Sequence, residues 1–369
     1  MNIQINRQEF LKHLTIGGAY AKLNRVLPIL ENVKIEINKD YINFESSDGE
    51  NTIKHKYQTN TMQEDCVYIV VNYSDLVNYL KLIKDNNVIF EVENNNIKII
   101  HSKGDVVYPL MDADDFPKVN YEDCNNGEAL TINSNLFLEW LNKATPFIST
   151  DELRPAMTGI FFYNIDNELG CCASNSHILY TSFNKLDNNS SVNNQEWIIN
   201  KNSIIPLKNI CTTTDSVIIS NLNRNILVEG GDTMLYIRII DGKYPNFKVI
   251  IPKNNNIRYE LSKDALKEAI MRLSIVKGAS ELIKFTFSDN NLNVNCENVD
   301  FAKNASENID CVGNNNIIIG LKSSFLLNIL PSIETEKIIM EMSDPNKPIV
   351  IKNNNENNDI IIIMPMQIN

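Results

Sequence analysis

The side chains that most often carry out catalysis are few in this chain and lie far apart. There are four histidines, and none has the HExxH spacing of a zinc protease: His13, His55, His101 and His177. The sequence also lacks a GxxxxGKS or GxxxxGKT phosphate loop and a GxSxG nucleophile turn. The acidic cluster at 112–115 has the oxygen ligands that Mg²⁺ prefers, but its place after an apolar run is more typical of a turn. We therefore expect no intrinsic catalysis and no metal or cofactor.

The cysteines and the apolar segments indicate a compartment. Seven cysteines are present, an odd number, and none has CxxC spacing. This pattern argues against a disulfide framework and against a zinc site, and it favours free thiols in a reducing compartment. No stretch approaches the roughly 20 apolar residues of a spanning helix, and segment 1–10 is too polar for a signal peptide. We expect a folded cytoplasmic protein.

The elements that would position functional side chains recur three times along the chain. Each copy begins with a short strand that runs into a helix with apolar residues four apart: Ile3–Ile5 with Phe10 and Leu14, Leu130–Ile132 with Phe137 and Leu141, and Arg258–Leu261 with Leu266 and Ile270. Alternating strands, a second short helix and another hairpin follow in each copy. A repeat of this length is that of a whole domain rather than of a solenoid unit. The sequence predicts an α+β fold of three repeated domains, 1–124, 125–254 and 255–369.

The charge is distributed unevenly between the expected helices and the remainder. The chain carries a net charge of −12. The expected helices 7–25, 73–84, 135–143, 201–208, 262–277 and 322–331 together carry +9, which leaves −21 elsewhere. A basic helical surface within an acidic protein favours binding of nucleic-acid phosphates without sequence specificity. The alternative is that Lys and Arg simply favour helices and lie scattered over solvated faces.

Five segments, in the same order and at similar spacing, resemble the bacterial DNA polymerase III beta subunit, the sliding clamp family. They are LPILENV at 27–33, DFP at 115–117, LRPAMTG at 153–159, DGKYPNF at 241–247 and IMPM at 363–366. The resemblance covers nearly the whole chain. It implies three clamp domains with helices lining the inside and antiparallel sheets outside, and a head-to-tail homodimer that closes as a ring around duplex DNA. The implied role is to give a replicative polymerase processivity.

The resemblance also implies which residues act. Those expected to face DNA are basic: Lys12, Lys22, Arg25, Lys81, Arg154, Lys201, Lys208 and Arg272. Each of these is alternatively an ordinary surface charge. The dimer contact is expected to join Val106 and Tyr108 at a strand edge to Ile275 and Val276 at a helix end, because exposed apolar edges need covering. A buried role within one domain is the alternative for these apolar residues.

The implied partner site is a pocket between the second and third domains that accepts a short peptide from the replicative polymerase, the clamp loader, repair polymerases and other clamp-binding proteins. An apolar groove with flexible Met walls suits several related peptides. The matching positions are Met157, Ser174, His177, Ile178, Leu179, Pro245, Val249, Ile250, Phe325, Pro348, Ile362, Met364, Pro365 and Met366.

The pocket sequence departs from the family pattern at several positions. Segment 174–179 reads SNSHIL where TDGHRL is usual, and Val249 and Gln367 stand where Arg is frequent. These changes put the preferred peptides in doubt. A clamp-fold regulatory or scaffold relative with altered partner specificity is therefore the alternative function.

Overall fold

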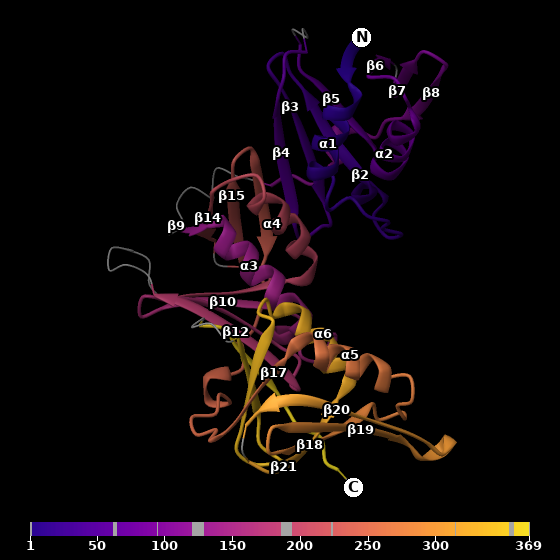
Figure 1. The fold of residues 1–369 in the computed structure, drawn as a ribbon. Helices are drawn as coiled ribbons and strands as arrows, with labels where there is room; N and C mark the ends of the chain where they lie inside the picture. The colour runs from indigo at the N-terminus through magenta and orange to yellow at the C-terminus, as the bar shows by residue number, and fades with distance from the viewer. Residues whose placement is uncertain are drawn as a thin grey trace. The chain divides into compact units, whose positions relative to one another are not determined.

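A computed structural model describes residues 2–61, 65–93, 95–119, 129–185, 194–222, 224–313, 315–353 and 358–368 (Figure 1). The chain forms two compact units, the first from Met1–Leu138 with Asn202–Ile239 and the second from Glu139–Lys201 with Ile240–Asn369. No helix in the described ranges is long and apolar enough to cross a membrane. The predicted domain boundary at 124/125 lies outside the described residues, and the three domain ranges stay a prediction.

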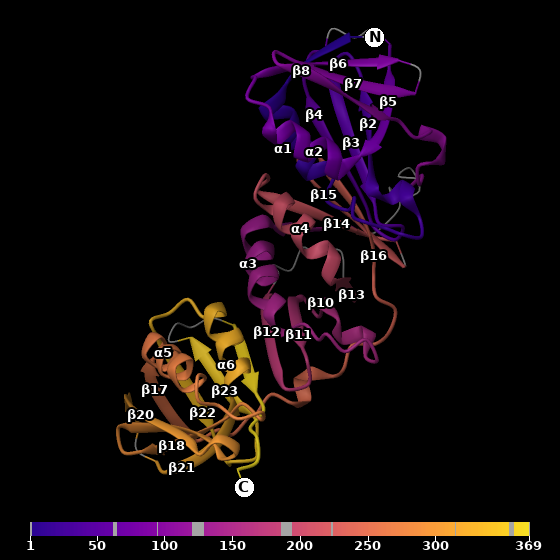
Figure 2. The ribbon, with the colours of Figure 1, turned by 90° about the vertical axis from the view of Figure 1, so that its right-hand side faces the viewer.

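The first repeat contains two sheets. One has the strand order β1-β6-β7-β8, from Asn2–Asn6, Asn87–Glu93, Asn96–His101 and Gly104–Pro109. The strands β5-β2-β3-β4, from Val67–Asn72, Asn32–Ile37, Tyr41–Ser47 and Thr52–Gln58, begin an eight-stranded sheet. The helices α1 (Arg7–Gly17) and α2 (Tyr73–Leu82) pack side by side against β2 to β5 (Figure 2).

The second and third repeats have the same order of elements as the first. The second consists of β9 (Ala129–Asn133), α3 (Ser134–Ala144), β10 (Gly159–Ile165), β11 (Glu168–Ser174), β12 (Ile178–Lys185), β13 (Gln195–Asn200), α4 (Ile204–Cys211), β14 (Ser216–Asn221), β15 (Asn225–Gly230) and β16 (Thr233–Arg238). The third consists of β17 (Ile257–Ser262), α5 (Lys263–Leu273), β18 (Leu282–Ser288), β19 (Asn291–Asn298), β20 (Lys303–Val312), β21 (Ile317–Lys322), α6 (Ser323–Ile329), β22 (Lys337–Met342), β23 (Ile349–Asn353) and β24 (Ile360–Ile363). The predicted threefold repeat is confirmed.

The first helix of every repeat begins in the same way, directly after a strand. The side chains of Asn6, Asn133 and Ser262 accept hydrogen bonds from backbone N–H groups in the first turns of α1, α3 and α5. Such a cap satisfies donors that have no partner within the helix. The buried apolar residues predicted on these helices, for example Phe10 and Leu266, then lie in the core.

Two seams join the repeats, and they explain why the compact units divide the second repeat. Strand β4 pairs with β16, with Ile53 opposite Leu235, within the first unit. Strand β12 pairs with β24, with Leu179 opposite Ile362, within the second unit. Each seam extends a sheet continuously from one repeat into the next.

Helix α1 is shorter than the sequence analysis predicts. It ends at Gly17 rather than near Arg25, with Gly18 as the C-cap residue, whose N–H bonds to the carbonyl of Leu14 at 2.8 Å. Lys22 and Arg25 therefore lie in the loop after α1. Helix α5 likewise ends at Leu273 instead of 277. Within their observed bounds α1 to α6 carry +3, so the predicted helical charge of +9 is wrong.

Candidate partner-binding site

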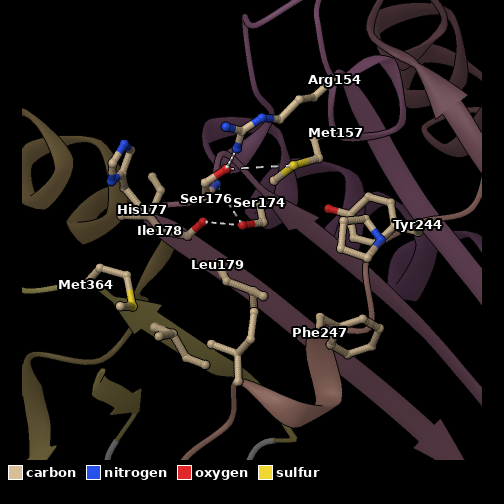
Figure 3. A pocket seen from close by; sticks show the side chains of 13 residues that line it. Arg154, Met157, Ser174, Ser176, His177, Ile178, Leu179, Tyr244, Phe247 and Met364 are labelled. Atoms are coloured by element: carbon tan, nitrogen blue, oxygen red, sulfur yellow. Dashed lines mark hydrogen bonds between the residues drawn. The ribbon is translucent and has the colours of Figure 1, made fainter. Parts of the chain in front are cut away.

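A pocket of about 460 Å³ lies in the second unit beside the seam between β12 and β24 (Figure 3). Its walls come from the segment after α3, the turn between β11 and β12, the segment after β16, and β24 with the residue that follows it. The lining residues are Arg154, Met157, Ser174, Ser176, His177, Ile178, Leu179, Tyr244, Pro245, Phe247, Ile250, Ile362 and Met364.

The turn between β11 and β12 builds the polar rim of the pocket. Asn175 Oδ1 accepts hydrogen bonds from the N–H groups of His177 and Ile178, which closes the turn. Ser176 has φ 77°, a left-handed backbone angle that favours glycine. Its hydroxyl lies 2.6 Å from Arg154 Nη1 and 3.8 Å from Met157 Sδ. The turn thus holds Arg154, which also contacts Asp151 at 3.6 Å, at the pocket.

The floor and far wall of the pocket are apolar. Leu179 and Ile362 are buried and lie opposite each other across the seam. Tyr244 stacks on Phe161 with ring centroids 4.8 Å apart, and Phe247 meets the same ring edge-on. Burial, with a further contribution from Cys172, raises the pKa of Tyr244, so its hydroxyl stays neutral. A site with such walls binds apolar side chains and selects their position by shape.

The structure brings together nine of the fourteen residues predicted for the partner pocket. They are Met157, Ser174, His177, Ile178, Leu179, Pro245, Ile250, Ile362 and Met364. Phe325 and Met366 do not line the cavity. The Phe325 ring stacks on His177 with centroids 5.4 Å apart, and the Met366 N–H bonds to the carbonyl of Gly320. Val249 is exposed, and it does not line the cavity, nor do Pro348 and Pro365.

Four lining residues were not predicted for the pocket: Arg154, Ser176, Tyr244 and Phe247. Tyr244 and Phe247 lie in the DGKYPNF segment, so the motif itself was the signal that could have found them. Arg154 was expected to face DNA. Its place beside Ser176 depends on the β11–β12 turn, which a linear motif does not reveal.

The other predicted DNA-facing residues occupy different settings. Lys12, Lys81 and Lys201 are exposed on α1, on α2 and just before α4. Lys208 on α4 is half-buried, and burial lowers its pKa. Arg272 on α5 is held by both carboxylate oxygens of Glu307, at 2.8 and 2.7 Å, which neutralises much of its field.

The predicted dimer residues lie at a strand edge and at a helix end, as expected. Strand β8 is an end strand of its sheet. Its Val106 and Tyr108 are half-buried against the core of the first unit, whereas Val107 between them is 52% exposed. Ile275, after α5, is 84% exposed, and Val276 is half-buried.

Comparisons with known proteins match one family along nearly the whole chain. The N-terminal, central and C-terminal domains of the DNA polymerase III beta subunit match residues 1–120, 131–246 and 248–367. The beta sliding clamp of Streptococcus pneumoniae is 22% identical and that of Helicobacter pylori strain J99 is 21% identical, covering 100% and 95% of this chain and 100% and 94% of theirs.

Solved structures show the same arrangement of elements. A Pseudomonas aeruginosa sliding clamp bound to griselimycin is 20% identical with a TM-score of 0.92, and the Thermotoga maritima beta subunit is 19% identical with a TM-score of 0.90. Each alignment covers 100% of both chains. The fold is therefore that of a sliding clamp. On the domain matches, the chain belongs to the DNA polymerase III beta subunit family. The predicted function, a DNA sliding clamp for a replicative polymerase, is confirmed.

Proposed function

We propose that two copies of this chain close head to tail around duplex DNA and tether the replicative polymerase to it. The observation that carries this proposal is the pattern of seams. Strands β4, β12 and β20 have equivalent places in their repeats, and so do β8, β16 and β24. Within the chain β4 pairs with β16 and β12 with β24. In both pairings the fourth strand of one repeat joins the last strand of the next repeat. The equivalent pairing for the third repeat would join its β20 to β8 of a second copy.

Both strands have an edge suited to such pairing. In the described part of the chain, β8 pairs only with β7, and β20 pairs with β19 along its length but with β17 at only two positions. Unpaired edges that carry apolar side chains are usually covered in the assembled protein. On the second unit Phe301, at the β19–β20 tip, is 71% exposed. Asn298 at this tip donates a hydrogen bond to the carbonyl of Lys277, near the exposed Ile275.

The contacts with DNA are proposed to be made by basic side chains on phosphates, without reading of bases. Lys12, Lys22, Arg25, Lys81, Lys201 and Lys208 are the proposed contacts. With +3 on the helices and −15 on the remainder, the charge contrast is smaller than predicted but has the same sign. Attraction to phosphates alone permits sliding.

The pocket is proposed to bind a short linear peptide of the polymerase, the clamp loader and repair polymerases in turn. Its apolar floor, its two Met side chains and the aromatic wall of Tyr244 and Phe247 support this proposal. The relative bound to griselimycin shows that a sliding clamp of this fold binds that compound. The protein would act in the cytoplasm without catalysis of its own.

Primer extension on a long circular template, with the cognate polymerase and clamp loader, tests this proposal. The chain should lengthen the products, and Leu179→Ala should reduce that effect while Met234→Ala, outside the pocket, should not. Unchanged product length with the wild-type chain would contradict the proposed role. Retention on circular DNA without longer products would indicate the regulatory relative, which the SNSHIL segment favours.

A further inference from the structure

A buried ion pair lies under the seam between β12 and β24. Lys143, at the end of α3, is 3% exposed, and Asp359, just before β24, is 8% exposed. Lys143 Nζ lies 2.9 Å from Asp359 Oδ2, 2.5 Å from Glu139 Oε1 and 3.7 Å from Glu334 Oε1. Tyr180 on β12 donates its hydroxyl to Asp359 Oδ1 at 3.0 Å. Removing two charges from water is costly, so such a pair is weak evidence of added stability.

The strand that follows is uniform in its own side chains, so its register depends on the residues that flank it. Strand β24 consists of four isoleucines, Ile360–Ile363. It pairs with Ile178–Thr181 of β12 on one side and with Ile349–Ile351 of β23 on the other. A slip of two residues along either neighbour would keep isoleucine at two of the four positions and would bring Asn358 and Asp359, or Met364 and Pro365, to the other two. Within the run of isoleucines the apolar pattern alone specifies the register weakly.

We propose that the Lys143–Asp359 pair sets the register of β24 against β12, and so decides which side chains of the C-terminal segment line the pocket. In the observed register Ile362 and Met364 line it. A two-residue slip would bring Ile360 or Met366 to those places. It would also take the Asp359 carboxylate away from the buried ammonium group of Lys143, which costs far more than an isoleucine exchange.

Two further observations support the pair as the fixed point. Burial would lower the pKa of Lys143, but its hydrogen bonds to Asp359 and Glu139 raise the pKa, so the side chain stays charged. At the other end of β24, Met364 N–H bonds to the carbonyl of His177 at 2.8 Å. A two-residue slip would bring the N–H of Ile362 or Met366 to the same carbonyl, so this bond does not distinguish those registers from the observed one.

A double variant, Lys143→Met with Asp359→Leu, removes both charges and so tests the register of β24 separately from the stability of the fold. Replacing a buried ion pair by apolar residues is often neutral or stabilising, so this variant should fold. Glu139 and Glu334 are partly exposed and remain solvated after the change. The matched control is Lys337→Met with Glu260→Leu, which removes a partly exposed pair between β22 and β17 at 2.9 Å.

Methyl NOEs in leucine- and isoleucine-labelled full-length protein report the register directly. The wild type and the control should show a Leu179–Ile362 contact. The double variant should show a second set of isoleucine signals and a weakened Leu179–Ile362 contact. Griselimycin binding, measured by calorimetry, should weaken about tenfold if only about a tenth of the molecules keep the native register. If the double variant keeps one set of signals and wild-type binding, the inference is wrong.

The milder Asp359→Asn variant covers the case in which the double variant does not fold. It keeps an acceptor for Tyr180 but weakens the attraction to Lys143, so a minor second register should appear, and a single native register would overturn the inference. The binding readout rests on the proposed function of the pocket. If the wild type binds neither griselimycin nor a polymerase peptide while the NOE pattern still changes in the variants, the proposed function fails and the register inference stands.

Discussion

The backbone N–H of Met364 donates a hydrogen bond to the carbonyl oxygen of His177 at 2.8 Å. This bond joins the end of β24 to the start of β12, and both side chains line the same pocket. The pocket is thus formed where two repeats meet, and its shape depends on how the C-terminal strand is docked.

Met364→Ala should weaken binding of griselimycin and of a cognate polymerase peptide about tenfold, because it removes a flexible apolar side chain that lines the pocket. Calorimetry on the full-length chain measures the change. Met234→Ala, on β16 in the first unit, is the matched control and should bind as the wild type does. Equal affinities for the two variants would show that the ligands bind elsewhere.

Arg154→Ala distinguishes a pocket role from a DNA role for this residue. Since its guanidinium is held at the pocket by Ser176 and Asp151, we expect weaker peptide binding and unchanged retention on DNA. Arg25→Ala should do the opposite, with weaker DNA binding and a smaller salt dependence. Loss of DNA retention alone in Arg154→Ala would restore the original DNA assignment.

Ser176→Gly should raise stability by about 1 kcal/mol, because glycine adopts the left-handed angle without strain. The same change removes the hydroxyl that positions Arg154, so peptide binding should weaken although the protein becomes more stable. Ala302→Gly, at φ 50° between β19 and β20, is the control that should stabilise without affecting the pocket. Tighter peptide binding in Ser176→Gly would contradict the positioning role.

His55 predicts a loss of stability in mild acid. Burial, with the nearby His13 and Lys12, lowers the pKa of His55 from 6.5 to about 4. Its ring hydrogen-bonds to the ring of His13 at 2.7 Å and, across the β4–β16 seam, to the hydroxyl of Thr233 at 2.8 Å. Between about pH 6.5 and pH 4 the unfolded chain therefore binds more protons than the folded chain. The free energy of unfolding should fall by roughly 2–3 kcal/mol as the pH drops through this range. Denaturant unfolding at pH 7 and pH 5 measures the fall. His55→Gln should flatten it and His101→Gln should not; an equal slope in both variants would remove His55 as the cause.

The repeat, its elements and most of the pocket were predictable because they leave local patterns. The strand-cap-helix starts recur at Asn6, Asn133 and Ser262, and the DGKYPNF and IMPM segments mark two walls of the pocket. The end of α1 was also predictable, since the adjacent Gly17 and Gly18 are a helix stop signal.

Other features depend on contacts between distant segments. The place of Arg154 follows from a turn 22 residues further along the chain. The Lys143–Asp359 pair spans 216 positions, and neither residue lies in a motif. Spacing along the sequence carries no record of such pairs, so only the folded chain reveals them.

Retention on DNA of different topology tests the central claim most directly. The chain should be loaded by the cognate clamp loader onto a nicked circular plasmid and separated from free protein by gel filtration, before and after the plasmid is cut once. A closed ring should stay with the circle and be lost from the linear form, since it can slide off the ends. Equal retention on both forms, or none on the circle, would contradict a ring that encloses DNA.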